Sequence, residues 1–209
     1  MGRLSAAELD AVTIDAYGTL VTLVDPVPEL TAALSARGVT RERDVVVAGF
    51  RAEVAHYTAH SGEGHDEAGL ARLQDDCARV FLDAVGAELD VEAFAPVYAG
   101  AMHFEVLPGV VAALERLRSL GLELAIVANW DLTLHRLLDE VVLTRFFREV
   151  VHAAGKPSPD GLLHALSRLG VDASRALHVG DDEVDRVAAE AAGMRVVVGS
   201  LPEAVTTLA

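Results

Sequence analysis

The stretch AVTIDAYGTL at residues 11–20 decides the fold of this chain. Its first four residues, from Ala11 to Ile14, are apolar or β-branched, which is typical of a buried strand. The run stops at Asp15, and Gly18 then marks a turn. In an open α/β sheet, ligands bind beyond the carboxyl ends of the strands. Asp15 is therefore the first candidate functional residue.

Similar short apolar runs recur in the second half of the chain, where they alternate with segments of helical periodicity. This alternation predicts an α/β fold with a parallel sheet and helices on both of its faces. The further predicted strands are residues 122–127, 150–152, 176–179 and 195–198. The predicted helices between them are residues 110–120, 132–143, 159–169 and 185–192.

The stretch between the first strand and this alternating region has a different pattern, because it contains no convincing strand. Its helical periodicity predicts helices at residues 30–36, 42–60, 69–85 and 91–103. We therefore expect a core domain formed by residues 1–23 and 105–209, with an inserted helical domain formed by residues 24–104.

The formal net charge of −15 on 209 residues restricts the partners of the chain. An acidic protein repels a phosphate backbone, so we expect no nucleic-acid partner. No apolar stretch approaches the roughly 20 residues of a membrane helix, and the first residues lack the pattern of a signal peptide. We therefore expect a cytoplasmic protein with no membrane partner, which binds a small-molecule substrate as a monomer or homodimer.

Polar side chains also follow the other predicted strands. Asn129 and Trp130 follow the second strand, Lys156 follows the third, and the acidic run GDDEVD at 180–185 follows the fourth. Because parallel strands end at one edge of the sheet, we expect these side chains to meet Asp15 there. A carboxylate can act as a nucleophile, lysine can hold an anionic group, and carboxylates bind Mg²⁺. The pattern predicts a combined phosphate and metal site.

Four of these segments, in this order, resemble the motifs of the haloacid dehalogenase superfamily. They are DAYGTL at 15–20, AN at 128–129, KP at 156–157 and GDDEVD at 180–185. The helical insertion resembles the cap of the first subfamily, so the resemblance spans nearly the whole chain. It implies a Rossmann-like core with a helical cap. It also implies a Mg²⁺-dependent phosphatase that acts on a small phosphorylated metabolite through an aspartyl-phosphate intermediate.

The resemblance implies a role for each matching residue. Asp15 is the expected nucleophile, and Lys156 and Tyr17 are the other expected catalytic residues. The expected metal ligands are Asp15, the carbonyl of Tyr17, Asp181 and Asp185, and the choice among the carboxylates of Asp181, Asp182 and Asp185 stays open. The expected substrate-binding residues are Thr19, Asn129, Trp130 and Arg51.

Two positions depart from the pattern of the family's phosphatases. Those enzymes carry a second Asp, the general acid and base, two residues after the nucleophile, where this chain has Tyr17. A phenol can donate a proton but is a poor base at neutral pH, and losing such a group typically costs about 10²- to 10⁴-fold in rate. Ala128 stands where a Ser or Thr hydroxyl usually binds the phosphoryl oxygens. The loop before Lys156 is also shorter than usual.

These departures leave two alternatives open. DAYGTL and the segment RAEVAHY at 51–57 also resemble L-2-haloacid dehalogenases, which need no metal and in which Arg51 would bind the substrate. Against this, dehalogenases carry Ser and Asn where this chain has an acidic run. The carboxylates of that run repel one another unless a cation is present. The other alternative is a catalytically weakened domain with a binding or regulatory role.

The scattered histidines of the insertion are expected to face solvent or to pack: His56, His60, His65 and His103.

Overall fold

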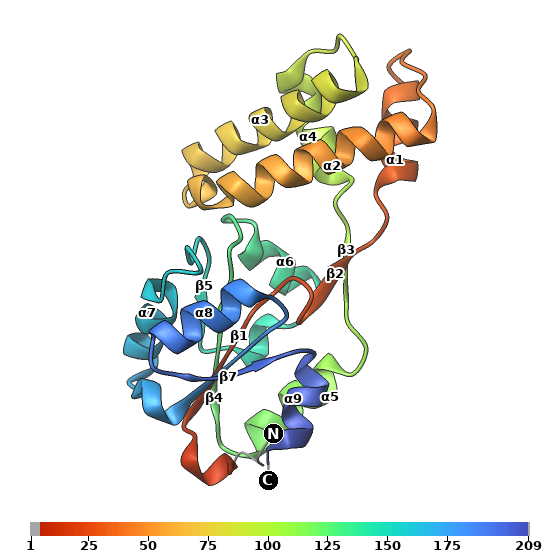
Figure 1. Ribbon diagram of the computed structural model, residues 1–209. Helices are drawn as coiled ribbons and strands as arrows, with labels where there is room; N and C mark the ends of the chain where they lie inside the picture. Colours follow the sequence, from red (N-terminus) through yellow and green to blue (C-terminus); the bar gives the residue numbers. More distant parts are fainter. Residues whose placement is uncertain (1–4, 209) are drawn as a thin grey trace. The chain divides into compact units, whose positions relative to one another are not determined.

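The structure is a computed structural model that describes residues 5–208 (Figure 1). The chain folds into two compact units. One contains the residues up to Thr22 together with those from Glu105 onward, and the other is Leu23–Phe104. Among the described residues, none of the helices has both the length and the apolar character that crossing a bilayer requires.

The first unit is built on a five-stranded sheet in which every neighbouring pair of strands is parallel. The strand order is β5-β4-β1-β6-β7, so β1 lies at the centre. Thr13 on β1 stands in register with Ala125 on β4 and with His178 on β6. The strands are β1 (Ala11–Ile14), β4 (Glu123–Val127), β5 (Glu149–Val151), β6 (Ala176–Gly180) and β7 (Arg195–Val198).

Helices cover both faces of this sheet (Figure 1). On one face, α8 (Glu183–Ala191) packs against β6 and β7, and α7 (Asp160–Leu169) buries small and branched side chains against Ala125 and Val127 of β4. The alternating residues of the strand face the opposite side, where α5 (Val110–Ser119) and α9 (Leu201–Thr207) pack together and contact β4 and β6. The predicted α/β class with a parallel sheet is confirmed.

The second unit consists of four helices around their own apolar core. The stacked rings of Phe81 and Phe94, with centroids 6.1 Å apart, lie in this core, and Cys77 is buried beside it. The helices are α1 (Val27–Ser35), α2 (Arg43–His60), α3 (Glu67–Val85) and α4 (Val91–Gly100).

The chain passes between the two units through a two-stranded sheet that the sequence did not predict. Its strands are β2 (Val21–Leu23) and β3 (Phe104–Val106), and the N–H of Val24 extends the pairing by donating to the carbonyl of His103. The helix predicted over residues 91–103 therefore ends early, at Gly100. Neither strand belongs to the region where short apolar runs alternate with helical segments, so the pattern that predicts the other strands does not extend to them.

Several other helices also differ from expectation, among them α1, which begins at Val27, three residues before the predicted start. The helix after β4 is α6 (Leu134–Glu140), which begins two residues late because Asp131 Oδ1 accepts hydrogen bonds from the Thr133 N–H and hydroxyl in a turn before it. Helix α8 begins two residues early, at Glu183, because Asp182 caps it. Helix α9 was not predicted, although Ser200 and Glu203 form a capping box, which is typical of the start of a helix.

Candidate active site

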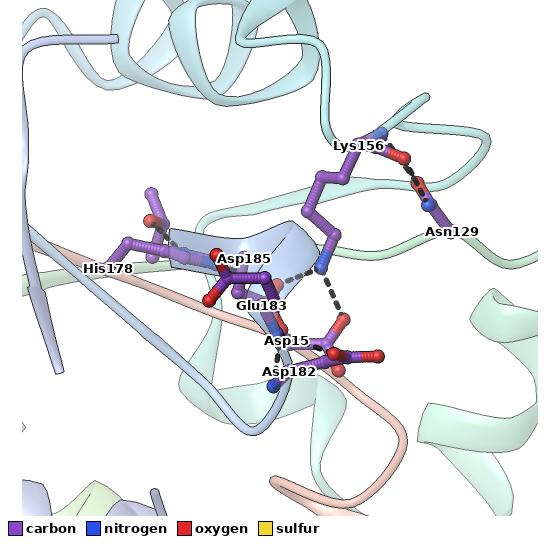
Figure 2. Close-up of polar contacts among 8 residues, drawn as sticks. Asp15, Asn129, Lys156, His178, Asp182, Glu183 and Asp185 are labelled. Carbon is purple, nitrogen blue, oxygen red and sulfur yellow. Dashed lines mark hydrogen bonds and ion pairs between the residues drawn. The ribbon is translucent and has the colours of Figure 1, made fainter. Parts of the chain in front are cut away.

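The predicted polar residues meet at the carboxyl ends of the strands in the first unit (Figure 2). Asp15 directly follows β1, Asn129 follows β4, and Lys156 lies in the loop between β5 and α7. Asp181 follows β6, and Asp185 lies in the first turn of α8. Residues from four separate segments of the chain are thus brought to the central part of one sheet edge.

Lys156 joins two carboxylates at the centre of this site. Its Nζ lies 2.6 Å from Asp15 Oδ1 and 2.5 Å from Asp185 Oδ1, and the side chain of Lys156 is only 2% exposed. The short loop before Lys156 therefore allows the lysine to reach the nucleophile position. Asn129 fixes this loop, because its Oδ1 accepts from the Lys156 N–H and its Nδ2 donates to the Lys156 carbonyl, both at 2.8 Å. Asn129 thus positions Lys156.

A buried chain of hydrogen bonds continues behind Asp185, through residues that sequence reasoning missed. His178 Nε2 lies 3.0 Å from Asp185 Oδ1, and Thr13 Oγ1 lies 2.8 Å from His178 Nδ1. Burial lowers the pKa of His178, so the imidazole is neutral. Because an ionised carboxylate can only accept, Nε2 carries the hydrogen and Nδ1 accepts from the Thr13 hydroxyl. The available signal was a polar residue within each of two apolar runs.

The two carboxylates that share Lys156 have opposite pKa shifts. Burial raises the pKa of Asp15 to about 6, against the effect of Lys156, and the neighbouring charge of Asp185 raises it further. Burial also acts to raise the pKa of Asp185, but the hydrogen bond from His178 and the charge of Lys156 outweigh it and lower the value to about 2. Asp185 is therefore the permanently ionised partner of the lysine.

The carboxylates of Asp15, Asp181 and Asp185 fit a divalent cation. One oxygen from each lies within 4.8 Å of the others. Burial and the nearby charges of Asp185 and Asp182 raise the pKa of Asp181, so this cluster holds more negative charge than Lys156 balances. Gly18 allows the turn after β1 to lie close to the Asp181 carboxylate, since a Cβ at this position would lie 2.1 Å from Asp181 Oδ2. Hard carboxylate oxygens are ligands that Mg²⁺ prefers.

The remaining predicted site residues have different surroundings. The side chain of Tyr17 is 52% exposed, and its carbonyl accepts no backbone hydrogen bond among the described residues. Thr19 is fully buried. Trp130 is also buried, and its ring N–H donates to the Thr133 hydroxyl at 3.1 Å. Arg51 is exposed on α2, in the helical unit. The functional roles expected for these residues stay predictions.

Comparison with known proteins identifies the family. A family model described as haloacid dehalogenase-like hydrolase matches residues 9–193. The chain therefore belongs to the haloacid dehalogenase-like hydrolases, and the recognition from four ordered motifs is confirmed. The chain is 35% identical over 188 residues to "Phosphoglycolate phosphatase 1" of Pseudomonas aeruginosa. The match covers 83% of this chain and 64% of that relative, so the chain spans less than two thirds of the relative's length.

Solved structures share the fold over almost the whole chain. One is a HAD-superfamily hydrolase of subfamily IA from Geobacter sulfurreducens, which is 22% identical with a TM-score of 0.63, the match covering 97% of both chains. Another is the L-2-haloacid dehalogenase of Xanthobacter autotrophicus, which is 24% identical with a TM-score of 0.66, covering 91% of this chain and 77% of that one. This likeness shows a common fold and does not separate a phosphatase from a dehalogenase.

Proposed function

We propose that the chain is a Mg²⁺-dependent phosphatase that hydrolyses the phosphate ester of a small metabolite, with Asp15 as nucleophile. The observation that carries this proposal is the cluster of three carboxylates around one lysine. Such a cluster attracts a divalent cation, and it would repel the carboxylate of a 2-haloacid. The name of the Pseudomonas aeruginosa relative supports a small phosphorylated acid as the substrate class.

The proposed reaction has two steps that the residues of this chain carry out. An oxygen of the Asp15 carboxylate attacks phosphorus, the bond from phosphorus to the ester oxygen breaks, and that oxygen takes a proton, for which the exposed Tyr17 hydroxyl is the proposed donor. Water then attacks the phosphorus of the aspartyl phosphate and passes a proton to the Tyr17 phenolate, which releases inorganic phosphate and restores both Asp15 and Tyr17. Lys156 orients Asp15 and balances charge on the transferring group.

The proposal assigns the metal to Asp15, Asp181, Asp185 and the Tyr17 carbonyl. Mg²⁺ held by these oxygens would neutralise charge on the phosphoryl group. The proposed substrate contacts are Thr19, Asn129, Trp130 and Arg51. We further propose that the helical unit, residues 24–104, is the cap domain of this family. A cytoplasmic location, a monomeric or homodimeric state and the absence of nucleic-acid and membrane partners stay predictions.

The test compares two classes of phosphate ester with and without Mg²⁺. We expect Mg²⁺-dependent hydrolysis of both an aryl phosphate and phosphoglycolate, and at least a 10³-fold loss of kcat for Asp15→Asn, because an amide cannot form the acyl phosphate. Tyr17→Phe should slow only phosphoglycolate, because an aryl oxide leaves without protonation whereas an alkoxide needs a proton. Asp172→Asn, which changes an exposed carboxylate before β6, is the matched control.

Other outcomes would point to the alternatives. Metal-independent release of halide from 2-chloropropionate, with no phosphatase activity, would replace the proposal by a dehalogenase. Inactivity toward both kinds of substrate while Mg²⁺ still binds would leave a domain that has kept the fold for binding or regulation. Full activity of Asp15→Asn would remove the proposed nucleophile.

A further inference from the structure

A second cluster of metal-ligating side chains lies in the first unit, outside the carboxylate site. His135 is in the first turn of α6, and His152 directly follows β5. Nε2 of His135 lies 3.2 Å from Nδ1 of His152. We propose that these two imidazoles form a binding site for a transition-metal ion such as Zn²⁺, separate from the carboxylates that would hold Mg²⁺.

The spacing of the two nitrogens matches ligation of one ion. Zn²⁺ binds histidine nitrogen at about 2.0–2.1 Å, so two nitrogens on a tetrahedral ion stand about 3.3 Å apart. The rings of His135 and His152 meet edge to face at 78°, with centroids 5.2 Å apart, so small ring rotations direct both lone pairs to one point. His135 is exposed and His152 is partly exposed, so an ion can enter and water can complete its coordination.

Backbone hydrogen bonds hold the segment that carries His152 in place. The segment after His152 is held by two hydrogen bonds, from the Ala153 N–H to the Trp130 carbonyl and from the Ala154 N–H to the Ala128 carbonyl. Ala153 takes a left-handed conformation with φ of 49°, which is uncommon for a residue with a side chain.

Burial and the nearby His152 lower the pKa of His135, which favours the neutral imidazole that binds metals. The carboxylates of Asp139 and Glu149 act on His135 in the opposite direction, so they supply negative charge beside the pair. Asp139 accepts a hydrogen bond from the Thr144 hydroxyl, and Glu149 pairs with Arg168 at 3.5 Å. Both carboxylates are therefore kept near the site by other residues.

The pair that sequence spacing would favour has a different geometry. His56 and His60 are four residues apart on α2, a spacing used for metal ligands on helices. Their rings are stacked, with centroids 4.2 Å apart and an angle of 24° between the planes, and Nδ1 of His60 lies 2.8 Å from the His56 carbonyl. Lone pairs in two parallel ring planes do not converge on one ion. These two residues therefore provide a matched control.

The experiment is a calorimetric titration of the untagged chain with Zn²⁺, in the presence of excess Mg²⁺ to occupy the carboxylate site. We expect one Zn²⁺ per chain. His135→Gln and His152→Gln should each weaken binding at least tenfold, while the double variant His56→Gln/His60→Gln and the exposed His164→Gln should leave it unchanged. Electron paramagnetic resonance with Cu²⁺ should show two bound nitrogens in the native chain and one in each single variant at the pair.

Absence of Zn²⁺ binding by the native chain would overturn the proposal, as would binding that survives both substitutions at the pair. Loss of binding in the His56→Gln/His60→Gln variant would move the site to α2. The Asp15→Asn variant should bind Zn²⁺ as the native chain does, so this result is independent of whether the chain is a phosphatase. Circular dichroism of each variant checks that the fold is kept.

Discussion

Asp15 and Asp185 show how two identical side chains beside one lysine acquire different protonation. Asp15 has a raised pKa of about 6, so the folded chain binds this proton more tightly than the unfolded chain. Its contribution to stability is present at low pH and is lost as the pH rises through about 6. Asp185, with a pKa lowered to about 2, contributes stability above pH 4 that is lost as the pH falls toward 2.

The raised pKa of Asp15 predicts that Mg²⁺ binding depends on pH. A proton on Asp15 competes with the cation, so the affinity for Mg²⁺ should be about tenfold weaker at pH 5 than at pH 7.5. The increase in Tm caused by Mg²⁺ should also be larger at pH 7.5, because the cation offsets the cost of the buried charge. Calorimetry and thermal melts at the two pH values test both effects. Asp15→Asn should flatten the dependence, and an unchanged slope in this variant would assign the proton to another group.

His178 is expected to act through Asp185 as a positioning residue. His178→Phe keeps a ring in the buried space but removes the hydrogen bond that lowers the pKa of Asp185. We expect a loss of about 1.5–3 kcal/mol in the free energy of unfolding, since the hydrogen bond goes to a charged group. We also expect a fall in kcat, and a pH profile of stability whose acid limb moves to higher pH because Asp185 then takes up its proton at a higher pH. Thr13→Val should give a smaller change in the same direction, and an unmoved pH profile for both variants would reduce His178 to a packing role.

At the scale of single elements, the turn after β1 brings the backbone close to the carboxylate of Asp181. Gly18→Ala would place a Cβ 2.1 Å from Asp181 Oδ2 and would strain a backbone with φ of 76°. The strain should cost about 1–2 kcal/mol of stability, and the displaced carboxylate should weaken Mg²⁺ binding. Gly170→Ala, at the end of α7, has φ of 73° and open space around the new Cβ, so it should lose similar stability and keep Mg²⁺ affinity. Equal Mg²⁺ affinities in the two variants would contradict this reading of the turn.

Elements that belong to a repeated hydrophobic pattern could be predicted from the sequence, whereas isolated short ones could not. The five strands of the sheet contain apolar runs that end in turns, so their order along the chain was evident. The pair β2 and β3 could not be predicted, because their pairing depends on contacts that are distant in the sequence. Helix α9 is an exception, because its cap at Ser200 is a local pattern that the sequence does carry.

The candidate site was partly predictable for a similar reason. Asp15, Lys156 and Asp181 follow strands, so a parallel sheet places them together whatever the details of packing. The partnership of Thr13 with His178 depends on the register of β1 against β6, which the sequence does not state. The double hydrogen bond between Asn129 and Lys156 likewise depends on loop geometry. The order of the residues along the chain thus predicted which side chains meet at the site, but not the hydrogen-bond partner of each side chain.

At the scale of the whole molecule, the net charge of −15 should slow the approach of an anionic substrate. Salt screens this repulsion, so kcat/KM for a phosphate dianion should rise a few-fold between about 20 and 200 mM NaCl at fixed Mg²⁺, while kcat stays constant. Steady-state kinetics over this range tests the expectation. A fall in kcat/KM with added salt would mean that the local field of Lys156 and the bound cation dominates the approach.

The two passages of the chain between the sheet unit and the helical unit run through β2 and β3, which are hydrogen-bonded neighbours. Paired strands lie only about 4.7–4.9 Å apart, so both junctions of the insertion are adjacent. The helical unit can therefore be exchanged for another insertion whose two ends lie equally close together. The order of the strands around Asp15 would be inherited unchanged. Evolution, or a protein engineer, can in this way exchange the helical unit while leaving the arrangement of side chains around Asp15 intact.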